Sequence, residues 1–170
     1  MRVQFPKFIL PLLFVSACDG KDGKVDTGDL QDTDPEQVYD EGCILVDGEG
    51  GYQWLTDAIT VADSGSTISL CEGEITESVT VDKPVTIEGP EDEELIWNAE
   101  TNMAALTIQG AEGVVVRNVS IRSTRNGINI DNAVDTLVEN VQLLAIGGTG
   151  ARAVDATNTT FKDCYFGQLE

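Results

Sequence analysis

The chain has 170 residues, of which 41% are apolar, so it can form one domain with a substantial core. Its 30 acidic and 10 basic side chains give a net charge of −20, which opposes binding to nucleic-acid phosphates. It has no histidine, which excludes a Ser-His-Asp triad and zinc sites built on imidazole. The many valines, isoleucines and threonines favour β structure over a helical bundle.

The first 17 residues have the pattern of a secretory signal peptide. Arg2 and Lys7 supply its positive charge, and the apolar stretch 8–15 is shorter than the roughly 20 residues that cross a bilayer. The sequence Val-Ser-Ala-Cys that ends at Cys18 resembles the lipobox of bacterial lipoproteins. The resemblance implies cleavage before Cys18 and acylation of its sulfur and amine. The alternative is an ordinary signal peptide that contains a cysteine.

A lipid on Cys18 would hold the protein in the membrane of the bacterial cell envelope. Asp19 follows the cysteine, and in enteric bacteria an aspartate there favours retention in the inner membrane. Other lineages do not follow that rule. We therefore expect the outer membrane or the cell surface, and the inner membrane is the alternative.

Residues 18–41 form an acidic segment that would connect the lipid to the domain. Positions 19–41 contain nine acids, two lysines and few apolar residues, so burial cannot offset the entropy of ordering them. We predict a disordered tether extended by its own charge. Calcium binding is the alternative, but the segment lacks the spacing of an EF-hand loop. No cofactor is predicted.

The folded domain is expected over residues 42–170. Its one predicted helix covers 52–63, where Leu55, Ala58, Ile59 and Ala62 form a single apolar stripe. Short strands rich in β-branched residues follow at 67–70, 78–81 and 85–88.

The second half of the chain repeats itself. Residues 105–121, 127–143 and 150–166 align without gaps, at offsets of 22 and 23 residues. Apolar residues match in columns, among them Leu106 with Ile128. Val85 and Ile87 lie 21 residues before Leu106 and Ile108, which predicts a further turn of the pattern.

A repeat of this length with several short strands is typical of a solenoid. The leucine-rich signature is missing, so we predict an all-β parallel β-helix with three short strands per coil. The polar column Asn118, Asn140 and Asp163 fits a bend with left-handed backbone, where amides hydrogen-bond between coils. Asn98 would begin this column if one residue is dropped between coils. The role of the column is structural.

The region 52–166 resembles the amino-terminal part of the pectin-lyase-like superfamily. The matching pieces are Ala58-Ile59 with Ala62, Gly65-Ser66-Thr67-Ile68, the turn 72–77, Lys83-Pro84 and Ile87-Glu88-Gly89. Ser66, Glu72 and Ile75 replace the Asp, Pro and Tyr of the family pattern. The resemblance implies a right-handed β-helix whose first coil is capped by the helix. It does not select an activity, because the superfamily contains lyases, hydrolases, adhesins and copper-site proteins.

Three cysteines remain besides Cys18. Cys43 precedes the predicted helix and Cys71 ends the strand after it, and the envelope is oxidising enough for a disulfide between them. The closed loop of about 28 residues would add on the order of 3 kcal/mol of stability. Cys164 falls in an inward column with Val119 and Val141, which predicts a buried free thiol.

The candidate ligand-binding residues lie on the outward face of the first strand of each coil. Two outward columns are predicted: Thr86, Thr107, Asn129 and Arg152, then Glu88, Gln109, Asp131 and Val154. Asn129, Asp131 and Arg152 would form one polar patch near Arg125, suited to weak binding of a sugar chain. A solvated polar face is the alternative. No acid recurs in a column, so neither a catalytic set nor a metal site is predicted.

The two tryptophans and one acidic run also bear on the predicted binding surface. Trp54 and Trp97 have rings that stack on sugars, but Trp54 is expected to pack against the domain. The acidic run 91–94 is predicted to be a solvated loop.

The third repeat lies four residues from the end of the sequence. Solenoids need a cap at each end. We therefore expect that further coils follow, or that a partner or a second copy covers this end. The sequence predicts a lipid-anchored envelope protein whose β-helix binds or scaffolds surface polysaccharide. The alternatives are the amino-terminal part of a polysaccharide lyase or glycoside hydrolase, and an adhesin-like stalk.

Overall fold

The computed structural model describes residues 42–91, 93–144 and 146–167, which belong to one compact unit. The predicted signal peptide, Cys18 and the acidic tether lie outside the described residues. The elements in chain order are β1 Ile44–Val46, β2 Glu49–Tyr52, α1 Leu55–Val61, β3 Thr67–Ser69, β4 Gly73–Thr76, β5 Val79–Val81, β6 Thr86–Glu88, β7 Leu95–Asn98, β8 Leu106–Gln109, β9 Val115–Arg122, β10 Ile128–Asp131, β11 Leu137–Leu144, β12 Ala151–Val154, β13 Thr160–Lys162 and β14 Tyr165–Gly167.

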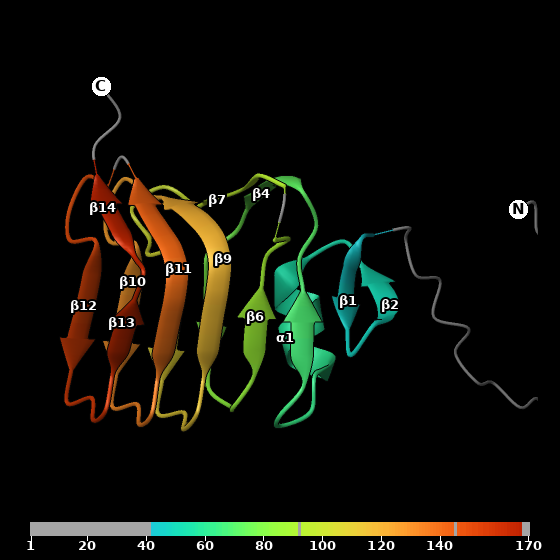
Figure 1. The fold of residues 1–170 in the computed structure, drawn as a ribbon, viewed down its shortest axis with the longest axis horizontal. Helices are drawn as coiled ribbons and strands as arrows, with labels where there is room; N and C mark the ends of the chain where they lie inside the picture. The colour runs from blue at the N-terminus through green and yellow to red at the C-terminus, as the bar shows by residue number, and fades with distance from the viewer. Residues whose placement is uncertain (1–41, 92, 145, 168–170) are drawn as a thin grey trace, which may run out of the picture. The chain divides into compact units, whose positions relative to one another are not determined.

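The strands stack as the coils of a parallel β-helix (Figure 1). One face is a four-stranded parallel sheet in the order β12-β10-β8-β5. The other two faces belong to a ten-stranded sheet, because β9 and β11 each bend and contribute to both. The first half of β11 pairs with β13 and its second half with β14. The predicted all-β fold, with three strand segments per coil, is confirmed.

Each coil turns through left-handed residues that recur at fixed positions. Three columns of positive φ run through the last coils: Gly110, Asn132 and Asp155; Gly113, Asp135 and Asn158; Asn118, Asn140 and Asp163. Glycine, asparagine and aspartate are the residues that adopt this backbone most readily. Asparagine and aspartate side chains also bond between coils, as Asn158 Nδ2 donates to Asp135 Oδ1 at 2.8 Å. The predicted bend at Asn118, Asn140 and Asp163 is confirmed.

Aliphatic side chains fill the interior in columns that follow this register. Leu106 pairs with Ile128, and Ile128 with Ala151, which confirms the offsets of 22 and 23 residues. Leu106 and Ile128 are fully buried. The turn before them was assigned wrongly from the sequence. Val79, not Val85, precedes Leu106 in the stack.

The second coil is irregular because its turn between β6 and β7 is longer than the corresponding bends within β9 and β11. Residues 89–94 fill this turn, whereas Asn118 alone makes the same bend in β9. Asn98 consequently pairs with Arg122 and stands outside the Asn118 column, which corrects the predicted start of that ladder. Its amide donates to the carboxylate of Glu74 instead.

The helix α1 lies over the first coil and is shorter than predicted. The backbone of Trp54 is extended and that of Ala62 is no longer helical, so the helix contains the seven residues Leu55–Val61. The predicted stripe is confirmed, since Leu55, Ala58 and Ile59 are at most 6% exposed. A helix of two turns is unstable alone, so contacts with the coil must hold it.

Two side chains from the first coil bind the ends of α1. Glu77, itself 7% exposed, accepts the backbone N–H groups of Leu55 at 2.7 Å and Thr56 at 3.0 Å. Lys83 donates to the carbonyls of Thr60 at 3.2 Å and Ala62 at 2.7 Å. These contacts satisfy backbone groups that have no partner inside the helix, and their charges complement the helix dipole.

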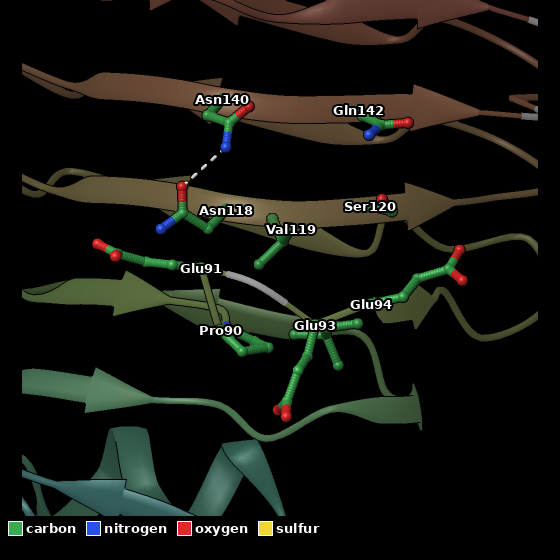
Figure 2. A pocket seen from close by; sticks show the side chains of 10 residues that line it. Pro90, Glu91, Glu93, Glu94, Asn118, Val119, Ser120, Asn140 and Gln142 are labelled. Atoms are coloured by element: carbon green, nitrogen blue, oxygen red, sulfur yellow. Dashed lines mark hydrogen bonds between the residues drawn. The ribbon is translucent and has the colours of Figure 1, made fainter.

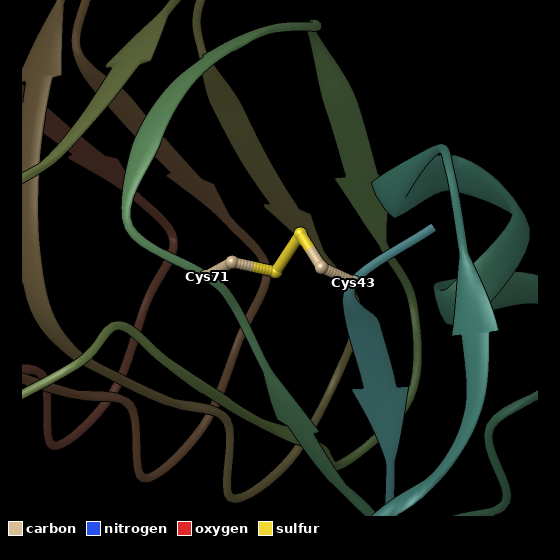
Figure 3. Close-up of a disulfide and its surroundings, with 2 residues drawn as sticks. All are labelled: Cys43 and Cys71. Atoms are coloured by element: carbon tan, nitrogen blue, oxygen red, sulfur yellow. A yellow bond between two sulfur atoms is a disulfide. The ribbon is translucent and has the colours of Figure 1, made fainter. Parts of the chain in front are cut away.

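The amino-terminal hairpin is joined covalently to the coils. Cys43 and Cys71 form the predicted disulfide, with their Cα atoms 6.0 Å apart (Figure 3). Strand β1 pairs with β3 in antiparallel orientation and so covers the first edge of that sheet. Cys164 is a free thiol, as predicted, but it is half-buried and not enclosed. No helix in the described part of the chain is long and apolar enough to cross a membrane.

Replacing Glu77 tests whether this carboxylate holds the helix in place. Glu77→Gln removes the charge that accepts two N–H groups, and charge-assisted hydrogen bonds contribute about 1.5–3 kcal/mol each. We expect the free energy of unfolding in urea to fall by about 1–3 kcal/mol, with faster amide exchange at Leu55 and Thr56. Glu72→Gln, an exposed change in the turn before β4, should stay within about 0.5 kcal/mol of the parent. Equal losses in both variants would contradict the assignment.

Candidate functional site

A polar groove of about 350 Å³ lies beside the bends of β9 and β11 (Figure 2). The long turn after β6 forms one wall, and the outward side chains of the two strands form the other. The lining residues are Pro90, Glu91, Glu93, Glu94, Leu95, Asn118, Val119, Ser120, Asn140 and Gln142.

The groove exists because the second coil has a longer turn than the coils beside it. Gly89 begins this turn and donates its N–H to the carbonyl of Arg117 at 3.0 Å. A Cβ atom at Gly89 would lie 2.0 Å from the carbonyl oxygen of Asn118, so only glycine fits there. Pro90, Glu91, Glu93 and Glu94 follow and line the groove before β7 begins at Leu95. The groove lies between these residues and the regular bends at Asn118 and Asn140.

Amide and hydroxyl groups repeat along one wall of the groove. Asn140 Nδ2 donates to Asn118 Oδ1 at 2.9 Å, so the two amides are aligned from coil to coil (Figure 2). Ser120 and Gln142 are paired in the same register one step further along the strands. The opposite wall is lined by Glu91, Glu93 and Glu94, although the side chain of Glu93 points away from the two strands (Figure 2). The groove therefore offers hydrogen-bond donors on one side and acceptors on both.

The structure brings three of the four predicted ligand-binding residues together. Asn129 and Arg152 are register neighbours on β10 and β12, and Arg152 forms an ion pair with Asp131 at 3.3 Å. Arg125 is occupied elsewhere, because its guanidinium donates to the carbonyl of Asn102 at 3.3 Å. Asn129 accepts a hydrogen bond from Asn126 at 3.0 Å.

The predicted outward columns contain an error in their first members. Thr86 and Glu88 lie on β6 in the ten-stranded sheet, whereas Thr107 and Gln109 lie on β8 in the four-stranded sheet. Thr80 is the true neighbour of Thr107. Glu88 and Asp131 thus stand on different faces of the β-helix.

Glu88 instead belongs to a column of alternating charge: Glu88, Arg117, Glu139 and Lys162. Arg117 donates to Glu88 at 2.5 and 3.0 Å, and Lys162 donates to Glu139. Hydrogen bonding to Glu88 raises the pKa of Arg117. The hydrogen bond from Lys162, then its charge, lowers the pKa of Glu139, and the same contact raises the pKa of Lys162. The Glu139 carboxylate therefore stays ionised at neutral pH.

The two tryptophans have the reverse of their expected environments. Trp97 is fully buried and its indole N–H donates to the Glu77 carbonyl at 2.9 Å, so its ring cannot stack on a ligand. Trp54 precedes α1 and is 51% exposed, which corrects the expectation that it packs against the domain.

Sequence reasoning identified the loop but missed the groove. The acidic run was predicted to be a solvated loop, and Asn118 and Asn140 were assigned a structural role only. A signal was present in the spacing, because the second coil is longer than the later repeats and the extra residues include Gly89 and Pro90.

Within the described residues no cluster of histidine, cysteine, aspartate or glutamate side chains is placed to hold a metal ion.

Comparison with known proteins finds no relative of this chain. No protein-family model, curated protein or solved structure matches the chain. The parallel β-helix is therefore established by strand order and register, and the pectin-lyase-like resemblance stays a prediction.

Two substitutions at Asn140 separate its backbone role from its side-chain role. Its φ of 50° is unfavourable for residues with a Cβ, by roughly 1–2 kcal/mol for an ordinary side chain. Both Asn140→Gly and Asn140→Ala lose the amide hydrogen bond, but only alanine adds this strain. We expect alanine to lower the free energy of unfolding by about 1 kcal/mol more than glycine.

Gln142 on the same strand is the control, because its backbone is ordinary extended β. There glycine should be the more destabilising replacement, by about 0.5–1 kcal/mol. The same order of alanine and glycine at both positions would show that the bend does not require a left-handed residue.

Proposed function

We propose that this protein is a lipid-anchored lipoprotein of the bacterial cell envelope whose β-helix binds polysaccharide without cleaving it. The observation that supports it is the groove between residues 89–94 and the bends at Asn118 and Asn140. Small-ligand sites are concave and carry a few well-placed polar groups. This groove is the concave surface from which several aligned polar side chains project.

The chemistry of the groove favours a neutral glycan. Sugar hydroxyls both donate and accept hydrogen bonds, and they match a wall that combines amides, a hydroxyl and carboxylates. The groups on β9 and β11 recur at the strand spacing of about 4.8 Å, so successive sugar units can meet equivalent partners. Glu91, Glu93 and Glu94, on a chain of net charge −20, disfavour an acidic polymer such as polygalacturonate.

The placement of the carboxylates supports binding over hydrolysis. Glycosidases need two carboxyl groups that flank one bond, about 5–9.5 Å apart. In the groove the three glutamates all belong to one wall, whereas the opposite wall carries amides and a hydroxyl, and the side chain of Glu93 points away from that wall (Figure 2). Outside it, Glu88, Glu139 and Asp131 are engaged by basic partners. A binding or scaffolding role fits this arrangement.

The alternative is the amino-terminal part of a polysaccharide lyase or glycoside hydrolase. The resemblance of residues 52–166 to the pectin-lyase-like superfamily favours it, and so does the coil with three strand segments capped by a helix. Release of unsaturated sugars from polygalacturonate in the presence of calcium would replace the binding proposal with this one.

The lipid anchor is tested by Cys18→Ala. Acyl chains on Cys18 would hold the protein in the membrane fraction, whereas the variant has no sulfur to acylate. We expect the parent in membranes and the variant in the soluble fraction after cell disruption, assayed by immunoblotting. Equal membrane association of both proteins would remove the anchor from the proposal.

Glycan binding is tested by replacing two exposed glutamines, one inside the groove and one outside it. Gln142 lines the groove and Gln109 lies on β8 in the other sheet, and both are exposed. In affinity electrophoresis through gels containing a neutral polysaccharide, we expect Gln142→Ala to weaken retardation about fivefold, as for the loss of one hydrogen bond of about 1 kcal/mol. Gln109→Ala should behave as the parent. Retardation by no neutral glycan, or equal loss in both variants, would contradict the assignment.

A further inference from the structure

Arg122 on β9 has no partner, unlike every other basic side chain in the described residues. It is half-buried, and its Nε is enclosed without a hydrogen-bond acceptor. No hydrogen bond or ion pair engages its terminal nitrogens within the described part of the chain. The basic side chains that do have partners are Lys83, Arg117, Arg125, Arg152 and Lys162. Because buried donors nearly always have an acceptor, the guanidinium of Arg122 is a candidate for a ligand that the chain does not supply.

Arg122 stands beside the groove, on the side away from its glutamates. It follows Ser120 by two residues on one strand, so both side chains project outward on the same face. Two residues of extended chain place their Cα atoms about 7 Å apart. The register neighbours of Arg122 are Asn98 on β7 and Leu144 on β11, and neither carries a charge. A ligand that contacts Ser120 and Gln142 in the groove therefore comes within reach of this guanidinium.

The chemistry of a free guanidinium selects an oxyanion. Its planar N–H donors match the two oxygens of a carboxylate, and it stays protonated at physiological pH. A free anion is opposed by the net charge of −20, and a polymer with an acid on every unit would also meet Glu91 and Glu94. A carboxylate on a chain of otherwise neutral units avoids the second repulsion, since only the acidic unit has to lie at Arg122.

We propose that Arg122 is an anion subsite of the groove, which rests on the proposed function because neutral units in the groove supply the rest of the binding. The ligand is then a sparsely acidic glycan, with neutral units between residues 89–94 and the bends of β9 and β11, and a carboxylate-bearing unit at Arg122. In this arrangement Arg122 determines specificity, because it distinguishes such a glycan from a neutral polymer with the same backbone.

Two cellulose ethers with the same backbone test the proposal, namely neutral hydroxyethyl cellulose and carboxymethyl cellulose of low substitution. The full chain is run in a nonionic detergent through affinity-electrophoresis gels that contain either polymer. We expect the parent to bind the carboxymethyl polymer about tenfold more tightly, as for one hydrogen-bonded charge pair. Arg122→Gln should lose this preference and keep the parent's affinity for hydroxyethyl cellulose, which also shows that the variant is folded.

Arg152→Gln is the matched control for net charge. It removes the same charge from the four-stranded sheet, where Arg152 pairs with Asp131. This variant should keep the preference for the carboxymethyl polymer. An equal loss in the two variants would attribute the preference to overall charge and overturn the subsite at Arg122.

Failure of the subsite and failure of the proposed function give different results. If the parent binds hydroxyethyl cellulose as tightly as carboxymethyl cellulose, and Gln142→Ala weakens both, the groove binds glycan but Arg122 is not an anion subsite. If Gln142→Ala weakens neither polymer, the groove is not the binding site and both proposals fall. Binding of neither polymer would overturn the subsite as well, whereas the proposed function falls only if no neutral glycan is retained.

Discussion

The structure depends on keeping successive coils in register. A parallel coil bonds only to the coils above and below it, so every corner must turn at the same place in each repeat. The backbone achieves this with positive φ at corresponding positions, such as Asn118, Asn140 and Asp163. Glycine, asparagine and aspartate occupy all three columns of this kind in the last coils. Once the corners are fixed, the alternation of each strand places aliphatic residues inside and polar residues outside.

The groove is a local departure from that register. Six residues between β6 and β7 replace a bend that later coils make with one residue, and Gly89 allows the backbone to pass close to Asn118. The coils on either side stay aligned, since β6 and β7 both pair with β9. An irregular turn can thus create a concave surface without disturbing the core. Its length and composition would set what the surface binds.

The fold was predictable from the sequence because its signals are local and repeated. The offsets of 22 and 23 residues gave the columns of the last three coils, and the period-3.6 stripe of Leu55, Ala58 and Ile59 identified the buried face of the helix. The second coil was placed wrongly, since Val85 fits the hydrophobic pattern as well as Val79 does. Only strand pairing distinguishes them. The environments of Trp54 and Trp97 and the hydrogen bonds of Glu77 depend on contacts between coils, which spacing along one chain does not reveal.

The disulfide has a mechanical consequence. Force applied through the amino-terminal segment reaches Cys43 and passes directly to Cys71, bypassing the hairpin and α1. The 28 residues of sequence between them, about 95 Å of extensible chain, are withheld from stretching. The first structure to yield would be the stack beyond Cys71, whose coils are held to their neighbours by strand pairing. A protein pulled from its amino terminus would lengthen coil by coil while the hairpin and α1 stay intact.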